Sequence, residues 1–182
     1  VHRFHRRASA PTRRWSPPKK SRIGAKRSAT KQGLGRSRGG FSTKIILTAA
    51  DEDTVIAVNV VPGQASDSPL LEPMLDATLE RAENLEELTG DKGFDGDRPR
   101  EACLDRSVNP NIPNKRNRVN LWHFEPEPYR ERNRIERLIG KAKQFRRLAT
   151  RYEKLKATFL GLLQLVFGFI RLRRTVAVLN TA

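Results

Sequence analysis

The feature that most constrains the fold is a pair of apolar, β-branched runs, Lys44–Ala49 and Thr54–Val61, separated by Asp51-Glu52-Asp53. Runs of this length and composition favour strands, and the acidic tripeptide between them supplies turn residues. Pro62-Gly63 then ends the second run. The pattern predicts a β-hairpin, so the core of the protein has to be built around a sheet.

Helical and extended patterns alternate after the hairpin. A helix over roughly 68–82 is predicted, capped by Ser66 or Asp67, because leucines and a methionine recur there at helical spacing. The later segments are a strand over Leu85–Thr89, a helix over Arg98–Asp105, a strand over Val108–Ile112, a polar loop over 113–128, and helices over roughly 129–150 and 152–173. The interleaved order predicts the α/β class with a mixed sheet.

The first 40 residues differ from the rest of the chain. They are rich in Arg, Lys, Ser, Pro and Gly and show no hydrophobic period, so we expect residues 1–32 to be disordered. A chain of 182 residues that is 37% hydrophobic allows one modest domain, which we assign to residues 33–174. Residues 175–182 are expected to form a C-terminal tail.

Charge is strongly segregated along the sequence. Residues 1–50 hold 14 Lys/Arg and no acidic residue, 45–114 are acidic overall, and 115–182 hold 17 Lys/Arg against 5 Asp/Glu, for a net charge of +16. Two basic blocks favour a polyanion such as DNA, because each neutralised phosphate releases counterions. A basic tail with a solvated helix face would give the same composition.

The longest apolar run of the sequence is Phe159–Ile170. This run is too short for a membrane span, so we expect a cytoplasmic protein.

The single cysteine of the sequence excludes disulfides within the chain and zinc sites built from cysteines. Cys103 is the single cysteine, so neither an internal disulfide nor a cysteine-based zinc site is available. Its position between Ala102 and Leu104 predicts a buried helical residue.

One face of the predicted helix after residue 128 combines a carboxylate with cations. At 100° per residue, Tyr129, Arg132, Glu136 and Lys143 fall within an arc of roughly 60°. A solvated helix in which Glu136 pairs with a neighbouring arginine explains this as well. Asp91 adds a second carboxylate, because it follows a predicted strand in Gly90-Asp91-Lys92-Gly93-Phe94-Asp95, where α/β proteins commonly build their sites. Two such carboxylates suit a hard cation such as Mg²⁺.

These residues resemble the Y-R-E-K pattern of bacterial insertion-sequence transposases of the DDE type. The pattern is Tyr129-x2-Arg132-x3-Glu136-x6-Lys143. Further segments resemble the family in its order: Gly35-Arg36-Ser37-Arg38-Gly39-Gly40, Pro62-Gly63-Gln64-Ala65 with Asp67, Asp91-Lys92-Gly93-Phe94-Asp95, and Phe145 to Tyr152. The resemblance covers about residues 33–173 and implies an RNase H-like fold and metal-dependent DNA strand cleavage and transfer at insertion-sequence ends.

The resemblance also implies roles for individual residues. Asp91 and Glu136 would be catalytic and would bind Mg²⁺ or Mn²⁺, with two ions in an intact family member. Arg132 and Lys143 would hold transposon-end DNA, and Tyr129 would stack on it or position it. Lys92, Arg36 and Arg38 are further candidates for DNA contacts, with an ordinary surface lysine an equal alternative for Lys92. DNA and a second copy of the chain are the expected partners.

One family residue is missing from the sequence. The family carries a first catalytic Asp on a strand ahead of the Gly-Arg-Ser-Arg-Gly-Gly segment, whereas no acidic residue precedes Asp51 here. Suitable synonymous codons can be chosen for Val1–Ala10. When those codons are translated from one nucleotide later, they encode Ser-Ile-Asp-Ser-Thr-Val-Val-Arg-Ala-His. The hypothesis is that residues 1 to about 20–30 are out of frame, so that the domain lacks its first catalytic strand and this fragment is inactive. The alternative function is a basic DNA-binding module without catalysis.

Overall fold

The computed structural model describes residues 2–7, 31–37 and 40–180. Its main sheet is built on β3 (Gly40–Ala49), which pairs antiparallel with β1 (His2–Arg7), β2 (Gly35–Ser37) and β4 (Val55–Pro62). A second, smaller sheet holds β5 (Glu87–Thr89) and β6 (Asn109–Asn111) as a parallel pair. The mixed α/β class is therefore confirmed.

The predicted hairpin is present and forms the centre of the molecule. Ile45 lies opposite Val60 and Leu47 opposite Val58 across the β3–β4 ladder, and the register shifts between Thr48 and Ala49. The Asp51 side chain holds the connecting turn, because it accepts hydrogen bonds from the backbone N–H groups of residues 53 and 54 at 2.7 and 2.8 Å. Apolar side chains point to both faces of this hairpin, so it is covered on both sides.

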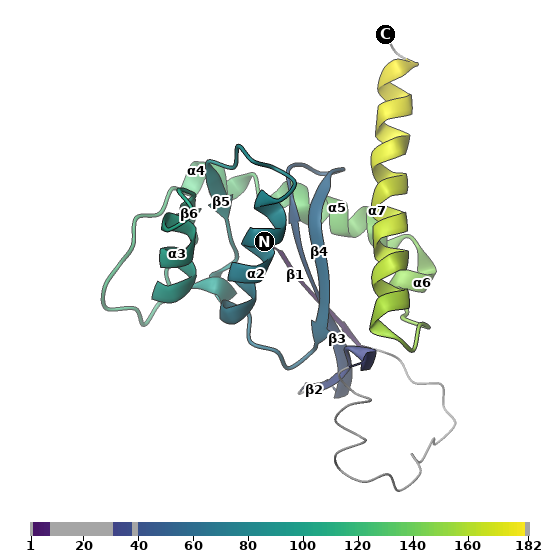
Figure 1. The fold of residues 1–182 in the computed structure, drawn as a ribbon, viewed down its shortest axis with the longest axis horizontal. Coiled ribbons are helices and arrows are strands. Elements are labelled where there is room, and N and C mark those ends of the chain that lie inside the picture. The colour runs from purple at the N-terminus through teal and green to yellow at the C-terminus, as the bar shows by residue number, and fades with distance from the viewer. Residues whose placement is uncertain (1, 8–30, 38–39, 181–182) are drawn as a thin grey trace, which may run out of the picture.

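Two hydrophobic clusters cover the two faces of the hairpin. One contains Ile46, Leu71, Leu75 and Phe94, and it joins the sheet to α2 (Ser68–Leu79) and to the elements that follow it. The other contains Ile45, Val60 and Leu163 and joins the opposite face to the C-terminal helices. The ribbon shows this arrangement, with α2 and α3 (Asp97–Leu104) on one side of the hairpin and α7 (Lys156–Leu179) on the other (Figure 1).

A strand is present near the N-terminus, where we expected no regular structure and a missing strand. Residues His2–Arg7 form β1, and each pairs with a residue of β3 from Ser42 to Leu47. The physical reason is that β3 presents a row of backbone N–H and C=O groups, and an extended segment that pairs with them satisfies those groups. The predicted disorder is therefore wrong for residues 2–7, and residues 8–30 lie outside the described residues.

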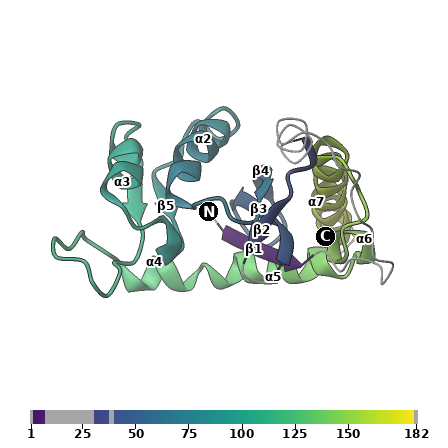
Figure 2. The same ribbon diagram turned by 90° about the horizontal axis from the view of Figure 1, so that it is seen from below.

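The helix predicted over 129–150 is divided into three. These are α4 (Pro126–Arg130), α5 (Asn133–Lys143) and α6 (Arg146–Ala149), and the chain is extended at Phe145, which lets that ring reach the second cluster. Seen from below, α4 and α5 run beneath the sheet, with β1 directly above α5 (Figure 2).

The last helix begins and ends later than predicted. It covers Lys156–Leu179, so most of the expected tail continues the helix. Its buried residues Phe159, Leu163, Val166, Phe167 and Ile170 recur at helical spacing and pack on the sheet. Within the described residues, none of the helices combines the length and apolarity needed to cross a membrane.

Candidate active site

Asp91 follows a strand, as predicted, and the structure shows that this strand belongs to the parallel pair. It follows β5 by two residues and begins a short 3₁₀ helix, η1 (Lys92–Phe94), with its Oδ1 atom accepting a hydrogen bond from the Lys92 backbone N–H at 2.7 Å. The Phe94 ring is fully buried and fixes the other end of η1. Asp91 is only half-buried, so the same turn that anchors its backbone leaves its carboxylate accessible to solvent.

A buried ion pair lies against this turn. The Lys44 amino group, on β3, is 2.7 Å from the Asp67 carboxylate, and both side chains are less than 8% exposed. A Cβ atom at Gly93 would lie 2.8 Å from Asp67 Oδ2, closer than real Cβ contacts, so glycine is required there. Of the two predicted caps of α2, Ser66 and Asp67, Asp67 stands at the N-cap position, but its side chain makes no cap hydrogen bond and binds Lys44 instead. A lysine inside an apolar strand was the signal that sequence reasoning overlooked.

A second buried ion pair joins the Asp91 turn to the long loop over 113–125. Arg100 on α3 is fully buried, and its Nη2 atom is 2.9 Å from Asp95 Oδ1 and 2.7 Å from the Ile112 carbonyl oxygen. Asp95 also accepts a hydrogen bond from the Lys115 backbone N–H at 2.7 Å, and Arg118 lies 3.0 Å away. Burial raises the pKa of Asp95, but these hydrogen bonds and charges outweigh burial and hold the pKa below its ordinary value.

Tyr129, Arg132 and Glu136 are brought together, as the spacing predicts. Arg132 lies over the Tyr129 ring at 5.3 Å and donates a hydrogen bond to Glu136 Oε1 at 2.9 Å. Arg132 stands between α4 and α5 with helical backbone angles, so the helical spacing continues across the junction. The Tyr129 ring meets Phe124 edge-on, with ring centroids 5.3 Å apart. Glu136 is 52% exposed, which leaves part of its carboxylate open to solvent.

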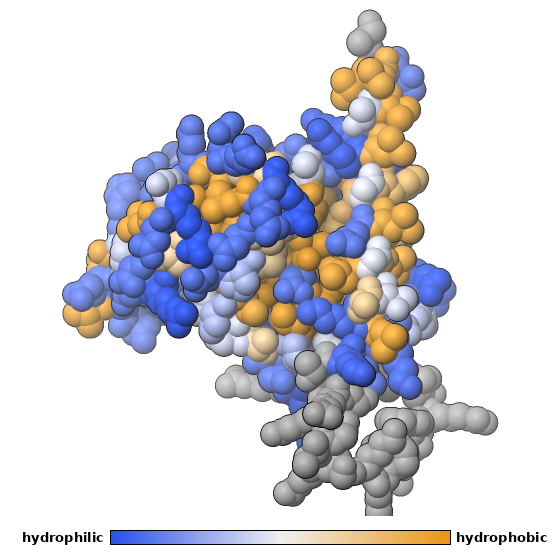
Figure 3. Space-filling view, viewed as in Figure 1, coloured by the Kyte–Doolittle hydropathy of each residue, from blue (hydrophilic) through white to orange (hydrophobic). Residues whose placement is uncertain are grey.

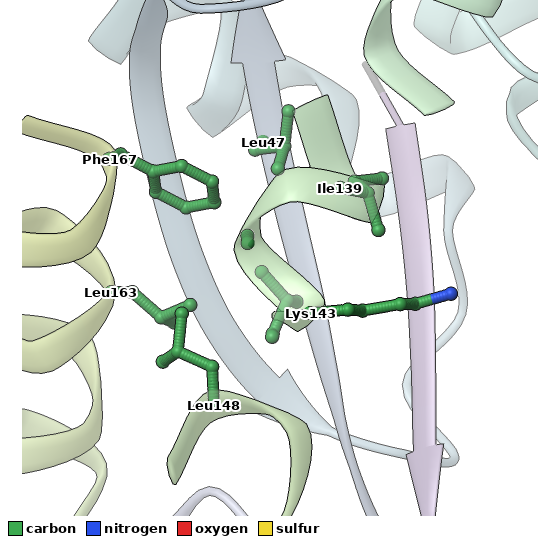
Figure 4. A pocket seen from close by; sticks show the side chains of 8 residues that line it. Leu47, Ile139, Lys143, Leu148, Leu163 and Phe167 are labelled. Atoms are coloured by element: carbon green, nitrogen blue, oxygen red, sulfur yellow. The ribbon is translucent and has the colours of Figure 1, made fainter. Parts of the chain in front are cut away.

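Lys143 stands two helical turns beyond Glu136, at the end of α5. Its aliphatic stem borders a small apolar pocket that Ile139, Leu148 and Leu163 also line. The close view shows the amino group pointing away from these side chains and toward β1 (Figure 4). The charged end of Lys143 therefore faces the side of α5 on which β1 lies.

The other predicted DNA contacts are scattered. Lys92 is exposed on η1, next to Asp91. Arg36 is exposed on β2, and Arg38 lies outside the described residues. The hydrogen bonds and ion pairs described for Asp91 and Glu136 do not include Arg36, so it lies apart from the other residues predicted to contact DNA.

Strand β5 and the start of α5 face a common hollow. Its volume is about 380 Å³, and its lining includes Glu87 and Thr89 from β5 and Arg132 and Ile135 from the helical side. Neither Asp91 nor Glu136 lines this hollow, but Thr89 precedes Asp91 by two residues and Arg132 is the residue that binds Glu136. Within residues 2–7, 31–37 and 40–180, no group of three or more His, Cys, Asp or Glu side chains is placed to hold a metal ion.

Comparison with known proteins identifies the family. Residues 10–167 match the family described as the transposase DDE domain. No curated protein matches the chain, and no solved structure matches it. The match covers both Asp91 with its turn and the Tyr129–Lys143 segment, and it spans more than half of the chain. The function that follows for the family is DNA transposition, with DNA as the partner. This chain belongs to the transposase DDE domain family.

Proposed function

We propose that the chain is the catalytic portion of a Y-R-E-K-type insertion-sequence transposase, with Asp91 and Glu136 as two of its catalytic carboxylates and an RNase H-like arrangement of strands. The observation that carries this proposal is the hollow shared by β5 and α5. Asp91 follows the strand on one side of the hollow, and Glu136 is held by Arg132, which lines the other side.

Basic residues of the predicted site would bind the DNA backbone. Arg132 has a planar guanidinium that suits phosphate, and Lys143 and Lys92 supply further point charges. Tyr129 already packs against Arg132, so it would position that side chain or stack on an unpaired base. Arg36 and Arg38 would make separate contacts with the DNA backbone. The net charge of +16 supplies the general attraction.

A divalent cation fits this site only in part. Carboxylate oxygens are the ligands that Mg²⁺ and Mn²⁺ prefer, and Asp91 and Glu136 both have exposed oxygens. Such ions, when bound in pairs, stabilise the attacking and leaving oxygens of a phosphodiester. The described residues offer two of the three carboxylates that the family uses, so we derive no catalytic step for this chain and propose that it is inactive alone.

The position of β1 bears on the missing carboxylate. In the out-of-frame hypothesis, the first catalytic Asp would stand at position 3, and Arg3 pairs with Ile46 in the middle of β3. An Asp at this position would lie on a strand directly above α5, the helix that carries Glu136 (Figure 2). We therefore propose that a chain with the frame restored over Val1–Ala10 regains the third carboxylate.

The test compares Mn²⁺ affinity and DNA strand transfer in four chains: the present chain, the frame-restored chain, and the frame-restored chain with either Asp91→Asn or Glu136→Gln. The frame-restored chain is expected to bind Mn²⁺ at least roughly 10-fold more tightly than the present chain, and Asp91→Asn or Glu136→Gln should remove that gain. Calorimetric titration measures the affinity, and a labelled transposon-end duplex reports strand transfer. Equal Mn²⁺ affinity in the restored chain and in both of its variants would show that these carboxylates do not share a site.

A non-catalytic DNA-binding module is the alternative, and the Arg132–Glu136 ion pair favours it. In that case Glu136 would serve only to orient Arg132 toward phosphate. Two results together would support the non-catalytic module. DNA affinity would be unchanged by Asp91→Asn but reduced by Glu136→Gln, and the frame-restored chain would show no metal-dependent strand transfer.

A further inference from the structure

One edge of the main sheet is formed by β4, which pairs with β3 and with no other strand among the described residues. Seen from below, β4 lies on the side of the sheet away from α5, between α2 and α7 (Figure 2). An edge strand presents backbone N–H and C=O groups with which another extended chain can pair. The outer side of β4 is therefore a place where the sheet can accept one more strand.

The ladder shows which backbone groups of β4 point outward. The Gly63 N–H donates to the Ser42 carbonyl oxygen at 3.0 Å, so residues at even steps from Gly63 bond to β3 in the regular part of the ladder. Val58 and Val60 stand at odd steps, so their N–H and C=O groups point out of the sheet. The Val60 N–H is bound by the Asn59 side chain at 2.8 Å. Pairing with a further strand is thus centred on Val58.

A hollow of about 430 Å³ lies against this part of β4. It is lined by the start of the strand, by the C-terminal end of α2 and by one side of α7, with the residues Thr54, Val55, Ile56, Ala57, Val58, Ala77, Arg81, Gln164, Phe167, Gly168 and Arg171. The space-filling view shows hydrophobic residues on the surface between these two helices (Figure 3). Small residues cut back both walls, because Ala77 ends at a methyl group and a Cβ atom added at Gly168 would meet no atom within 4 Å. The hollow therefore leaves room for an extended backbone beside Val58.

The charges at this hollow are positive. Its lining includes Arg81 and Arg171, whose side chains are 55% and 53% exposed, and no aspartate or glutamate among the described residues. Arg171 lies 3.9 Å from Asp51, in the turn that precedes β4. Arg81 follows Thr78 by three residues, and the Thr78 hydroxyl lies 2.7 Å from that of Thr48, near the same turn. The ion pairs of both arginines within the chain are exposed and 3.6 to 3.9 Å long, so each guanidinium can bind a further carboxylate.

We infer that an extended segment of a partner protein adds to the sheet along β4 and runs antiparallel to it, with an acidic side chain near its C-terminal end that binds Arg81 and Arg171. All ladders of the main sheet are antiparallel, so the added strand continues its pattern. An antiparallel segment has its C-terminal end beside the start of β4, where the two arginines lie. Backbone hydrogen bonds to Val58 supply affinity, and the carboxylate fixes the direction of the segment.

The test measures binding of a designed peptide to the full chain. The peptide alternates valine and threonine, ends in aspartate, and carries fluorescein at its N-terminus and an amide at its C-terminus. Fluorescence anisotropy should show saturable binding that weakens at least roughly 10-fold when asparagine replaces the aspartate. Arg171→Gln should weaken binding of the aspartate peptide by a similar factor and leave the asparagine peptide unchanged. Methylation of the backbone nitrogens on one edge of the peptide should abolish binding, and methylation on the other edge should not.

Two glycines of α7 give matched variants of the chain. Gly168→Leu fills the hollow, whereas Gly161→Leu adds the same side chain to the same helix outside the hollow. A Cβ atom at either position meets no atom within 4 Å, so both variants keep the fold, which far-UV circular dichroism checks. Gly168→Leu should weaken peptide binding at least roughly 10-fold, and Gly161→Leu should leave it unchanged.

Hydrogen exchange followed by NMR locates the bound peptide, because pairing with β4 slows exchange of the Val58 amide. Absence of binding at about 1 mM peptide, unchanged binding in Gly168→Leu, or equal loss in both glycine variants would each overturn the inference. Displacement of the peptide by unlabelled duplex DNA would assign the two arginines to DNA and would overturn it as well. Asp91 and Glu136 take no part in this test, so its failure leaves the proposed function untouched.

Discussion

Asp95 is expected to be the carboxylate whose loss most damages the fold around the candidate site. Its side chain is 1% exposed and accepts charged hydrogen bonds from Arg100, which is fully buried, while Arg118 lies 3.0 Å away. In Asp95→Asn, the Arg100 charge stays buried without its counter-ion. Removing one partner of a buried ion pair costs about 3–5 kcal/mol, a large part of the 5–15 kcal/mol by which domains of this kind are usually stable.

Urea denaturation measures this loss directly. With a urea dependence of about 2 kcal/mol per molar, the unfolding midpoint of Asp95→Asn should fall by roughly 1.5–2.5 M. Asp97→Asn is the matched control, because Asp97 binds the same Arg118 and also Trp122 but is 65% exposed. Its midpoint should stay close to that of the wild type. Equal midpoint shifts in the two variants would refute the reasoning that burial decides the cost.

Two further predictions follow from pKa shifts. The pKa of Asp95 is lower in the folded chain than in the unfolded chain. The stability that Asp95 contributes is therefore complete above about pH 4 and is lost as the pH falls through the pKa of the folded chain. Urea midpoints measured at about pH 6 and at about pH 3 should differ more in the wild type than in Asp95→Asn. Burial raises the pKa of the Cys103 thiol to about 11, so iodoacetamide at pH 8 should label it only after unfolding, and rapid labelling of the native chain would contradict its buried position.

Local patterns were sufficient to predict much of the secondary structure. The hairpin, α2, α3 and the segments of the two short strands β5 and β6 follow from residues close together in the sequence, where turn chemistry and hydrophobic period agree. The predicted single helix over 129–150 failed at Phe145, because the ring packs into a cluster formed with residues far away in the chain. β1 was missed for the same reason, since its partner β3 lies about 40 residues later.

The candidate site also combines features that local sequence predicts with features that only the tertiary structure shows. The spacing of Tyr129, Arg132 and Glu136 was sufficient to place them together, because helical geometry alone fixes the angle between them. The roles of Lys44, Asp67, Asp95 and Arg100 could not be read from the sequence, since each depends on a charged partner or a carbonyl group that only folding brings near. The requirement for glycine at position 93 belongs to the second group, because it arises from a carboxylate 26 residues earlier.

The sequence by itself therefore determined the family resemblance, the α/β class and the candidate carboxylates Asp91 and Glu136, since motifs and periodicity are properties of neighbouring residues. The tertiary structure decided how these groups are supported: the buried ion pairs beside the Asp91 turn, the hollow between β5 and α5, and the face of α7 that the core leaves exposed. The physical reason is that burial and charge pairing depend on distances through space, which the chain acquires only when its two hydrophobic clusters close on the sheet.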